Sequence, residues 1–158
     1  MSTRKISALI HTDHDARQLA RALETLRCCD EVLVVDHNSH EDTKKVAHEY
    51  GAKFREAVAG VDDGAYAFDC QYDWIFCLLP SETVSEALEA AVLEWKQAEP
   101  EEVTGYTVSI REQFHEAWRQ SGHEMRLVNR KRVNWTGRIP PMTTNSRQLS
   151  GDLLRFSE

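Results

Sequence analysis

The sequence predicts an α/β fold built on a central, mostly parallel sheet, and three observations predict it. Strand-like and helix-like segments alternate as β-α-β-α-β over the first 56 residues, with short connections between them. The run DEVLVVD is almost continuously apolar, as a parallel strand covered on both faces requires. A further apolar run, DWIFCLL, follows these segments, so the sheet continues beyond them. Crossovers between parallel strands are right-handed, which predicts helices packed on the sheet.

The first five elements are predicted from periodicity and from signals at their ends. Leu19, Leu23 and Leu26 recur at helical spacing after the first strand. Ser39 is placed to cap the second helix, with Asp42 three residues later as in a capping box. Gly51 supplies the left-handed residue that ends this helix. The predicted elements are a strand at 5–12, a helix at 15–26, a strand at 30–36, a helix from 39 to about 50 and a strand at 52–56.

The chain after residue 56 is less regular. The stretch AVAGVDDGAYAFDCQY is typical of a loop with a helical turn, and Pro80 ends the strand DWIFCLL. The segment SETVSEALEAAVLEWKQ predicts one amphipathic helix, with Val84, Leu88, Val92 and Trp95 on its apolar side. GYTVSI and EMRLVNR predict two more strands, separated by a polar surface turn, while the tail from residue 132 has weak periodicity.

Length and composition indicate one domain, residues 1–158, of an ordinary globular protein. The net charge of −7 argues against a nucleic-acid binder, which would present a basic face. The apolar stretches are too short for a membrane span, and the N-terminal one is too short for a signal peptide. The four cysteines lack CxxC spacing, which favours free thiols and a cytoplasmic location.

Several blocks resemble the family 2 glycosyltransferases, in particular the bacterial subgroup that includes lipopolysaccharide-core sugar transferases. ISALIHTDHD is similar to the opening strand I-S-V-I-I-P-T-Y-N-E, and DEVLVVDHNSHEDT is similar to the second block, D-E-I-I-V-V-D-S-G-S-T-D-x-T. DWIFCLLPSE corresponds to D-W-I-L-F-L-D-A-D-E, and EMRLVNRKRVNWTGRIPP corresponds to the late R-L-F-R-R…W-x-G-x-V-H-E block. The resemblance covers roughly residues 6–141 in order and spacing. It implies a GT-A-like (Rossmann-like) sandwich that binds a nucleotide-sugar.

The resemblance also implies a nucleotide-binding set at the carboxyl ends of the first two strands, where open α/β sheets bind ligands. Asp36 is suited to accept hydrogen bonds from a base or a ribose. Two alternatives stay open: Ser39 also fits a helix cap, and Asp36 also fits a carboxylate that bonds nearby backbone amides. The implied nucleotide-binding residues are Thr12, Asp15, Asp36 and Ser39.

The sequence departs from this family at its chemical positions. The two aspartates of the family's D-x-D motif, which hold Mg²⁺ or Mn²⁺, correspond to Leu79 and Ser81, so the usual metal site is not expected; Glu82 is the acid that remains. The H-E pair, whose carboxylate would be the candidate base, corresponds to Pro140 and Pro141. An R-N pair corresponds to Asp63 and Gly64.

These departures leave two functional hypotheses. The first is nucleotide-sugar-dependent transfer with metal-independent stabilisation of the diphosphate by cations of the late basic run. The second is a non-catalytic homologue that binds a nucleotide, a sugar or a protein partner, and the donor, acceptor and oligomeric state stay open. The cations considered are Arg126, Arg130, Lys131 and Arg132.

Histidines gather where the first two strands end. His11 and His14 follow one strand, and His37 and His40 follow the other, with aspartates between them. Imidazole and carboxylate ligands suit transition metals such as Zn, Ni, Cu or Fe. We expect His14, His37 and His40 to be the metal-ligating candidates, and the alternative is that these are loop residues that point in different directions.

Overall fold

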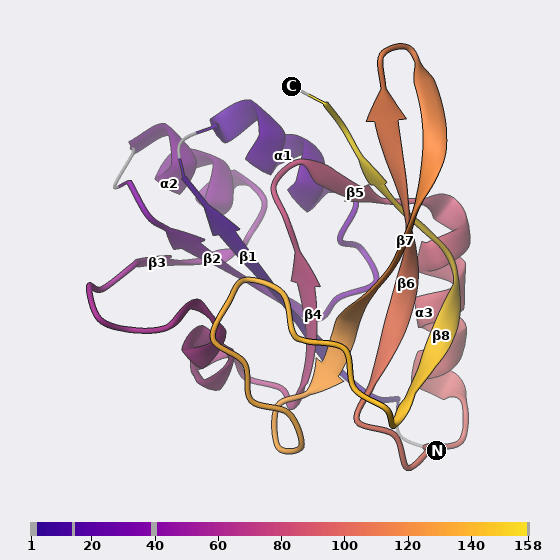
Figure 1. The fold of residues 1–158 in the computed structure, drawn as a ribbon. Helices are drawn as coiled ribbons and strands as arrows, with labels where there is room; N and C mark the ends of the chain where they lie inside the picture. Colours follow the sequence, from indigo (N-terminus) through magenta and orange to yellow (C-terminus); the bar gives the residue numbers. More distant parts are fainter. Residues whose placement is uncertain (1–2, 14, 39–40, 158) are drawn as a thin grey trace.

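The computed structural model of the protein describes residues 3–13, 15–38 and 41–157, and its framework is one eight-stranded sheet (Figure 1). The strand order is β3-β2-β1-β4-β7-β6-β8-β5. The strands are β1 (Ile6–Thr12), β2 (Glu31–Asp36), β3 (Lys53–Glu56), β4 (Trp74–Leu78), β5 (Glu82–Val84), β6 (Gly105–Phe114), β7 (Ala117–Asn129) and β8 (Ser146–Arg155). The helices are α1 (Ala16–Glu24), α2 (Glu41–Glu49), α3 (Glu86–Gln97) and the 3₁₀ helix η1 (Asp63–Asp69).

The first four strands of this order are parallel. β1 lies between β2 and β4, and β3 pairs with β2 at the sheet's edge. This confirms that the predicted strands near residues 6–10, 32–35 and 74–78 are parallel in one sheet, with the first two adjacent. Local periodicity was a sufficient guide here because each strand is followed by a short connection or an amphipathic helix.

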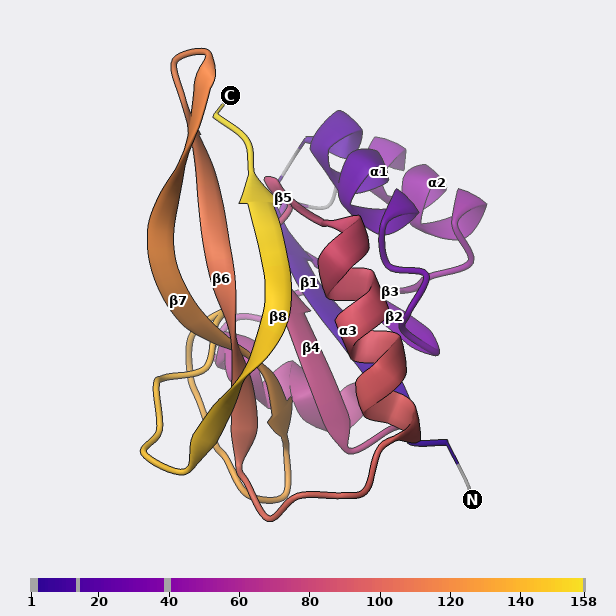
Figure 2. The same cartoon turned by 90° about the vertical axis from the view of Figure 1, so that its right-hand side faces the viewer.

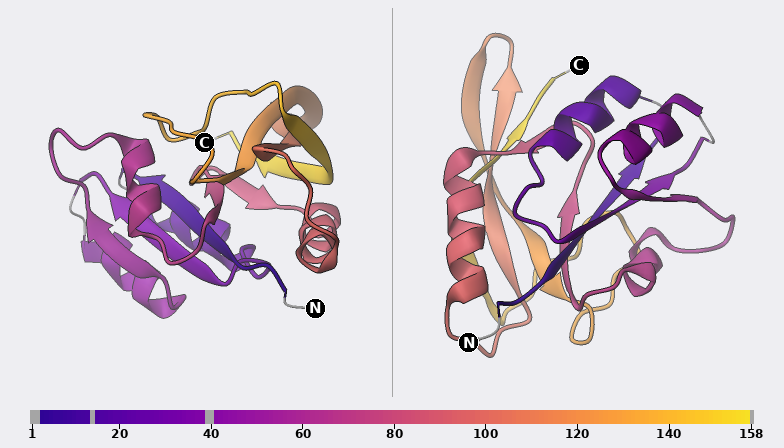
Figure 3. Two further views of the ribbon diagram at one scale, coloured as in Figure 1. Left: turned by 90° about the horizontal axis from the view of Figure 1, so that it is seen from below. Right: turned by 180° about the vertical axis from the view of Figure 1, so that it is seen from behind.

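The other strands form a curled, mixed half of the sheet (Figures 2 and 3). β7 pairs antiparallel with β4 and with β6, β8 pairs parallel with β6, and β5 pairs antiparallel with β8. The polar surface turn predicted between GYTVSI and EMRLVNR is wrong, because β6 and β7 continue through it as a long hairpin that turns at His115. β8 was not predicted, since only Leu149 and Leu153 of its ten residues are buried and its period is weak.

The predicted helix at 81–97 is corrected by the structure. Residues 82–84 form β5, and α3 begins at Glu86 after Ser85, whose hydroxyl accepts a hydrogen bond from the Leu88 N–H at 3.2 Å. Val84 is buried as a strand residue that pairs with Leu153 rather than as part of the helix face. The partner strand lies about seventy residues later in the chain, so local periodicity gave no sign of it.

Side chains alternate across the parallel strands into two apolar layers. Ile6, Ala8 and Ile10 of β1 pack in the layer that α1, α2 and α3 cover. Leu9 packs in the opposite layer, against Tyr66 of η1, and His11 follows it on the same face by alternation. Figure 3 shows α1 and α2 side by side on one face, with η1 on the other. The two faces therefore differ at the carboxyl edge of the sheet, where Thr12 and His11 point to opposite sides.

Two expectations from the sequence concern the cysteines and the membrane-spanning segments. The four cysteines are free thiols, as predicted, and burial raises the pKa of both Cys70 and Cys77 to about 12. Within the ranges that the structure describes, no helix combines the length and apolar character needed to cross a membrane.

Candidate functional site

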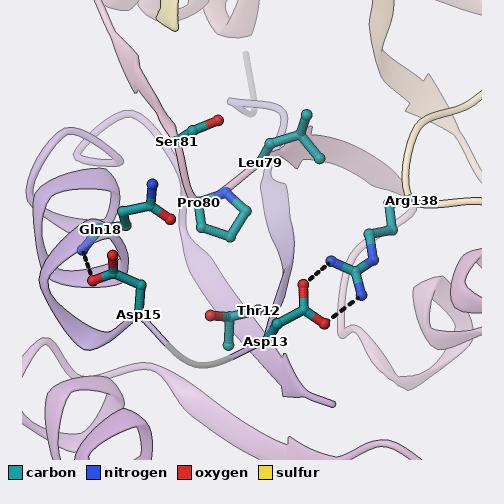
Figure 4. Close-up of a pocket in the computed structure, with 8 residues that line it drawn as sticks. All are labelled: Thr12, Asp13, Asp15, Gln18, Leu79, Pro80, Ser81 and Arg138. Atoms are coloured by element: carbon teal, nitrogen blue, oxygen red, sulfur yellow. Dashed lines mark hydrogen bonds and ion pairs between the residues drawn. The ribbon is translucent and has the colours of Figure 1, made fainter. Parts of the chain in front are cut away.

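A pocket of about 430 Å³ opens at the carboxyl edge of the sheet, where β1 and β4 end (Figure 4). This volume falls within the range of about 300–1,000 Å³ usual for small-molecule sites. The chain runs outward from β1 to β2 and β3 and then returns to β4 on the other side of β1. The pocket therefore lies at the switch in strand order, where open α/β sheets bind ligands. It is lined by Thr12, Asp13, Asp15, Gln18, Leu79, Pro80, Ser81 and Arg138.

Arg138 supplies the positive charge of this lining. Its guanidinium donates to both carboxylate oxygens of Asp13, at 2.9 and 3.1 Å, as Figure 4 shows. Its Nε also donates to Asp63 Oδ2 at 3.3 Å. These partners raise the pKa of Arg138, with the hydrogen bonds to Asp13 as the largest cause. The cation is thus held between two carboxylates from different parts of the chain.

Asp15 is the N-cap of α1. Its Oδ1 accepts hydrogen bonds from the backbone N–H groups of Arg17 and Gln18, both at 3.0 Å. Asp13 and Asp15 have D-x-D spacing in the sequence, but one carboxylate is paired with Arg138 and the other caps a helix. The cap also occupies amide groups at the helix N-terminus that would otherwise attract a phosphate.

The three implied nucleotide-binding residues that the structure describes do not share one place. Thr12 and Asp15 line the pocket, and the buried Oγ1 of Thr12 has no hydrogen-bond partner within the described ranges. Asp36 pairs in register with Thr12, is buried and accepts a hydrogen bond from the Asn38 N–H at 3.0 Å. Asp36 therefore bonds a nearby backbone amide, which is the alternative role given for it in the sequence analysis. It is not one of the residues that line the pocket. Ser39 lies outside the described residues.

The segment that corresponds to the D-x-D block lines the pocket, but it lacks the two aspartates of that motif. Leu79, Pro80 and Ser81 line one side, as Figure 4 shows. Glu82 instead turns into the fold, is 0% exposed and accepts from the Leu79 N–H at 2.9 Å and from two arginines. The acid that remains from this block is therefore part of the core.

The cations considered for the diphosphate do not line this pocket. Arg126 is 0% exposed and paired with Glu82 and Glu124. Arg130 and Lys131 pair with Asp73, next to the amino end of β4 and thus at the opposite edge of the sheet, and Arg132 donates to a backbone carbonyl of Val103. Arg138 occupies the pocket instead, and sequence reasoning missed it because its loop position depends on a distant contact.

That contact is made by Gly64. A Cβ atom there would lie 1.9 Å from the carbonyl oxygen of Trp135, and the Gly64 N–H donates to the carbonyl of Thr136 at 3.3 Å. The close approach joins η1 to the loop that contains Arg138. It therefore brings Asp63 and Arg138 together although they are 75 residues apart.

A second polar cluster lies beside the pocket on the η1 face. His11 Nδ1 is 2.9 Å from His37 Nε2, and Asp63 Oδ1 is 3.9 Å from the first atom and 3.6 Å from the second. Burial lowers the pKa of His11 to about 4; Asp63 opposes this shift, while His37 and Arg138 add to it. Of the three histidines expected to bind metal, His37 is here, and His14 and His40 lie outside the described residues.

Comparisons with known proteins find a partial likeness in sequence. No protein-family profile matches the chain. An uncharacterized glycosyltransferase of Rickettsia felis is 36% identical over 89 residues, which cover 54% of this chain and 31% of that protein. An uncharacterized glycosyltransferase of Rickettsia conorii is 34% identical over 91 residues, which cover 55% of this chain and 32% of that protein. The match thus spans about a third of the length of these relatives.

Solved structures extend the likeness to nearly the whole chain. A mycobacterial protein superposes with a TM-score of 0.66 over 96% of this chain and 67% of its own, at 13% identity. Mannosyl-3-phosphoglycerate synthase from Rubrobacter xylanophilus superposes with a TM-score of 0.51 over 69% of this chain and 41% of its own, at 17% identity. The fold is GT-A-like. At these identities the structures show the fold alone, and the sequence relatives show a likeness to glycosyltransferases over about half of the chain.

Proposed function

We propose that this chain is a family 2 type glycosyltransferase-like domain that binds the nucleoside part of a nucleotide-sugar and does not perform Mg²⁺- or Mn²⁺-dependent transfer. The observation that supports this proposal most directly is the pocket at the switch in strand order, between the ends of β1 and β4. The sequence blocks favour an origin among the bacterial transferases of the lipopolysaccharide-core type. Composition favours a cytoplasmic location for this binding function.

The polar groups at the end of β1 suit a nucleoside. The hydroxyl group of Thr12 and the carboxylates of Asp13 and Asp15 offer acceptors for ribose hydroxyl groups and for the N–H group of a pyrimidine. The Thr12 hydroxyl group is buried without a partner within the described ranges, and a bound ligand would satisfy it.

The opposite side of the pocket does not suit a metal-bound diphosphate. Mg²⁺ and Mn²⁺ require hard oxygen ligands, and the side chain of Leu79 offers none. Arg138 is already held by Asp13 and Asp63, so a phosphate group must compete with two carboxylates for it. We therefore expect the phosphates of a nucleotide-sugar to add little to the affinity of the nucleoside.

A second candidate function rests on Arg138 itself. If a nucleotide-sugar displaces Asp13 from the guanidinium, Arg138 can stabilise the leaving diphosphate without a metal ion. Transfer would then persist in EDTA. This outcome distinguishes the second candidate from the non-catalytic one.

The test is calorimetry of the full chain with uridine, UDP and a UDP-sugar, each in Mn²⁺ and in EDTA. Uridine and UDP should bind with affinities within about tenfold of each other, a difference of about 1.4 kcal/mol. Asp15→Asn should weaken binding while leaving stability unchanged, because asparagine caps helices as well as aspartate. Asp42→Asn, an exposed change in the first turn of α2, is the matched control.

Two results would overturn the proposal. Sugar transfer or hydrolysis that Mn²⁺ stimulates and EDTA abolishes would contradict its non-catalytic part. Failure of uridine, UDP and the UDP-sugars to bind would contradict its ligand.

A further inference from the structure

His11 and His37 are brought together by the register of the two central parallel strands. His11 pairs with Val35 of β2, and the His37 N–H donates to the Thr12 carbonyl at 2.8 Å. His37 lies two residues after Val35, so alternation places both imidazoles on the same face of the sheet. This is the face opposite α1 and α2.

Asp63 reaches the two histidines from η1. Gly64 has no side chain, so η1 packs directly against the backbone of Trp135. This contact fixes the position of Asp63, the residue immediately before Gly64. Its Oδ2 accepts from Arg138 Nε at 3.3 Å, while its Oδ1 is the oxygen nearest to both histidines. Arg138 is therefore a positioning residue for this carboxylate.

The three donor atoms have the separations of ligands around one cation. His11 Nδ1, His37 Nε2 and Asp63 Oδ1 are 2.9, 3.6 and 3.9 Å apart. A circle through three atoms with these separations has a radius of about 2.0 Å, which matches Zn–N bonds of about 2.0–2.1 Å and Zn–O bonds of about 2.0–2.2 Å. A metal ion at its centre would be at bonding distance from all three atoms.

The two imidazoles already meet through the nitrogens that would bind a metal. The contact between His11 Nδ1 and His37 Nε2 at 2.9 Å is a hydrogen bond in which one ring donates and the other accepts. A metal ion bonded to both nitrogens would take the place of this hydrogen bond, and the donor ring would then carry its proton on its other nitrogen.

The burial of His11 has a cost for the stability of the fold. The side chain is 1% exposed, and its Nε2 has no hydrogen-bond partner within the described ranges. An unpaired buried polar group costs about 1–3 kcal/mol. The neighbouring residues on this face, Leu9, Leu33 and Val35, are apolar, so an apolar residue would be the more stable choice at this position.

We propose that His11, His37 and Asp63 bind one divalent transition-metal ion, with Zn²⁺ as its representative. Two imidazoles and a carboxylate suit Zn²⁺ and its first-row neighbours rather than Mg²⁺. Three protein ligands leave a further coordination position for water or a ligand. The site replaces the expected set of His14, His37 and His40, and it goes beyond nucleotide binding, on which it does not depend.

The test uses the full chain, treated with a chelator and then returned to chelator-free buffer at neutral pH. Titration calorimetry with Zn²⁺ should give one ion per chain, and Co²⁺ should bind with visible absorption bands. Millimolar Mg²⁺ should not compete. His37→Ala and Asp63→Ala should each weaken Zn²⁺ binding more than about 100-fold, since even loss of an outer hydrogen-bond partner costs 10–100-fold. Both residues are partly exposed, so the variants should keep their fold.

Two control variants separate this site from other histidines. The variant with His48→Ala and His123→Ala removes two exposed histidines outside the cluster and should bind Zn²⁺ like the wild type. The variant with His14→Ala and His40→Ala should also retain binding. His11→Leu should lose Zn²⁺ binding while keeping or raising thermal stability, which a merely structural histidine would not do.

Three outcomes would overturn the proposal: no stoichiometric Zn²⁺ binding, binding that survives Asp63→Ala, or binding that disappears in the His14/His40 variant. Uridine titration of the same variants keeps this result separate from the proposed function. Loss of Zn²⁺ binding with uridine binding intact concerns the metal site alone, and the reverse result concerns the pocket alone.

Discussion

Two arginine–carboxylate clusters occupy different environments in this molecule. In the core, Arg126 donates to both oxygens of Glu82, at 2.6 and 2.7 Å, and Glu124 and Arg155 complete the group. At the carboxyl edge, Arg138 binds Asp13 in the same two-pronged way, at 2.9 and 3.1 Å. The pairing chemistry is alike, but Arg126 and Glu82 are 0% exposed while Asp13 is 52% exposed.

The difference in exposure separates a structural role from a binding role. Charges removed from water are tolerated only while every partner is present, so the core cluster fastens β4, β5, β7 and β8 to one another. Charges at the edge stay partly hydrated, which leaves them able to exchange partners with a ligand. The same arrangement of an arginine and an acid therefore locks the fold in one place and lines a pocket in the other.

The largest expected effect comes from opening the core cluster. Glu82→Gln removes the buried carboxylate that pairs with both Arg126 and Arg155 and should cost about 3–5 kcal/mol of unfolding free energy. Glu112→Gln removes a half-exposed partner of Arg155 at 3.6 Å and should cost less than about 1 kcal/mol. Urea denaturation of both variants at neutral pH measures the difference, and equal losses would contradict the structural role of the core cluster.

The second effect concerns pH at the edge. In metal-free protein the pKa of His11 is lowered to about 4 by burial, while the unfolded chain titrates near 6.5. The unfolded state then binds more protons between these values, so stability is complete above about 6.5 and is lost as pH falls toward 4. His37, Asp63 and Arg138 surround the ring; His37 and Arg138 add to the lowering of the pKa, and Asp63 opposes it.

The size of this pH effect is at most about 3.4 kcal/mol. It is measured as the difference between urea denaturation series for wild type and His11→Gln over this range. The glutamine variant should have a flatter profile. Parallel profiles would show that His11 is not held neutral by the fold.

The third effect concerns the contact that positions the edge cluster. Gly64→Ala places a Cβ atom 1.9 Å from the Trp135 carbonyl, so backbone must move, at about 1–3 kcal/mol. Gly137→Ala has its nearest atom at 3.9 Å and is the matched control in the same loop. Thermal unfolding gives the stabilities, and Gly64→Ala should also weaken Zn²⁺ binding by displacing Asp63. Retention of full Zn²⁺ affinity would show that Asp63 is placed independently of this contact.

The smallest effect on stability is expected at Arg138. Arg138→Met removes two partly exposed ion pairs and should change the unfolding free energy by less than about 1 kcal/mol. The same variant should change uridine or Zn²⁺ affinity, because it releases Asp13 and Asp63. A loss as large as that of Glu82→Gln would abolish the distinction between the two clusters.

The sequence predicts the parallel half of the fold because each of its strands is an apolar run with its own end signals. β5 and β8 escape prediction since each is defined by pairing with a strand far away in the chain, and β8 is half-exposed. The strand-end rule predicts that Thr12 and Asp15 lie at the edge of the sheet where the pocket opens. It did not find Asp63 or Arg138, because their positions follow from the close approach of Gly64 to Trp135.

The core cluster also has a consequence for the order in which the chain folds. Glu82 binds arginines that are 44 and 73 residues away in the sequence, so the cluster forms only after three distant segments have met. Closing such long loops is slow, and desolvated charges gain nothing until the last partner arrives. The cluster should therefore be absent from the folding transition state, and its loss should speed unfolding far more than it slows folding. The buried charges therefore give the folded chain kinetic stability, because they slow its unfolding.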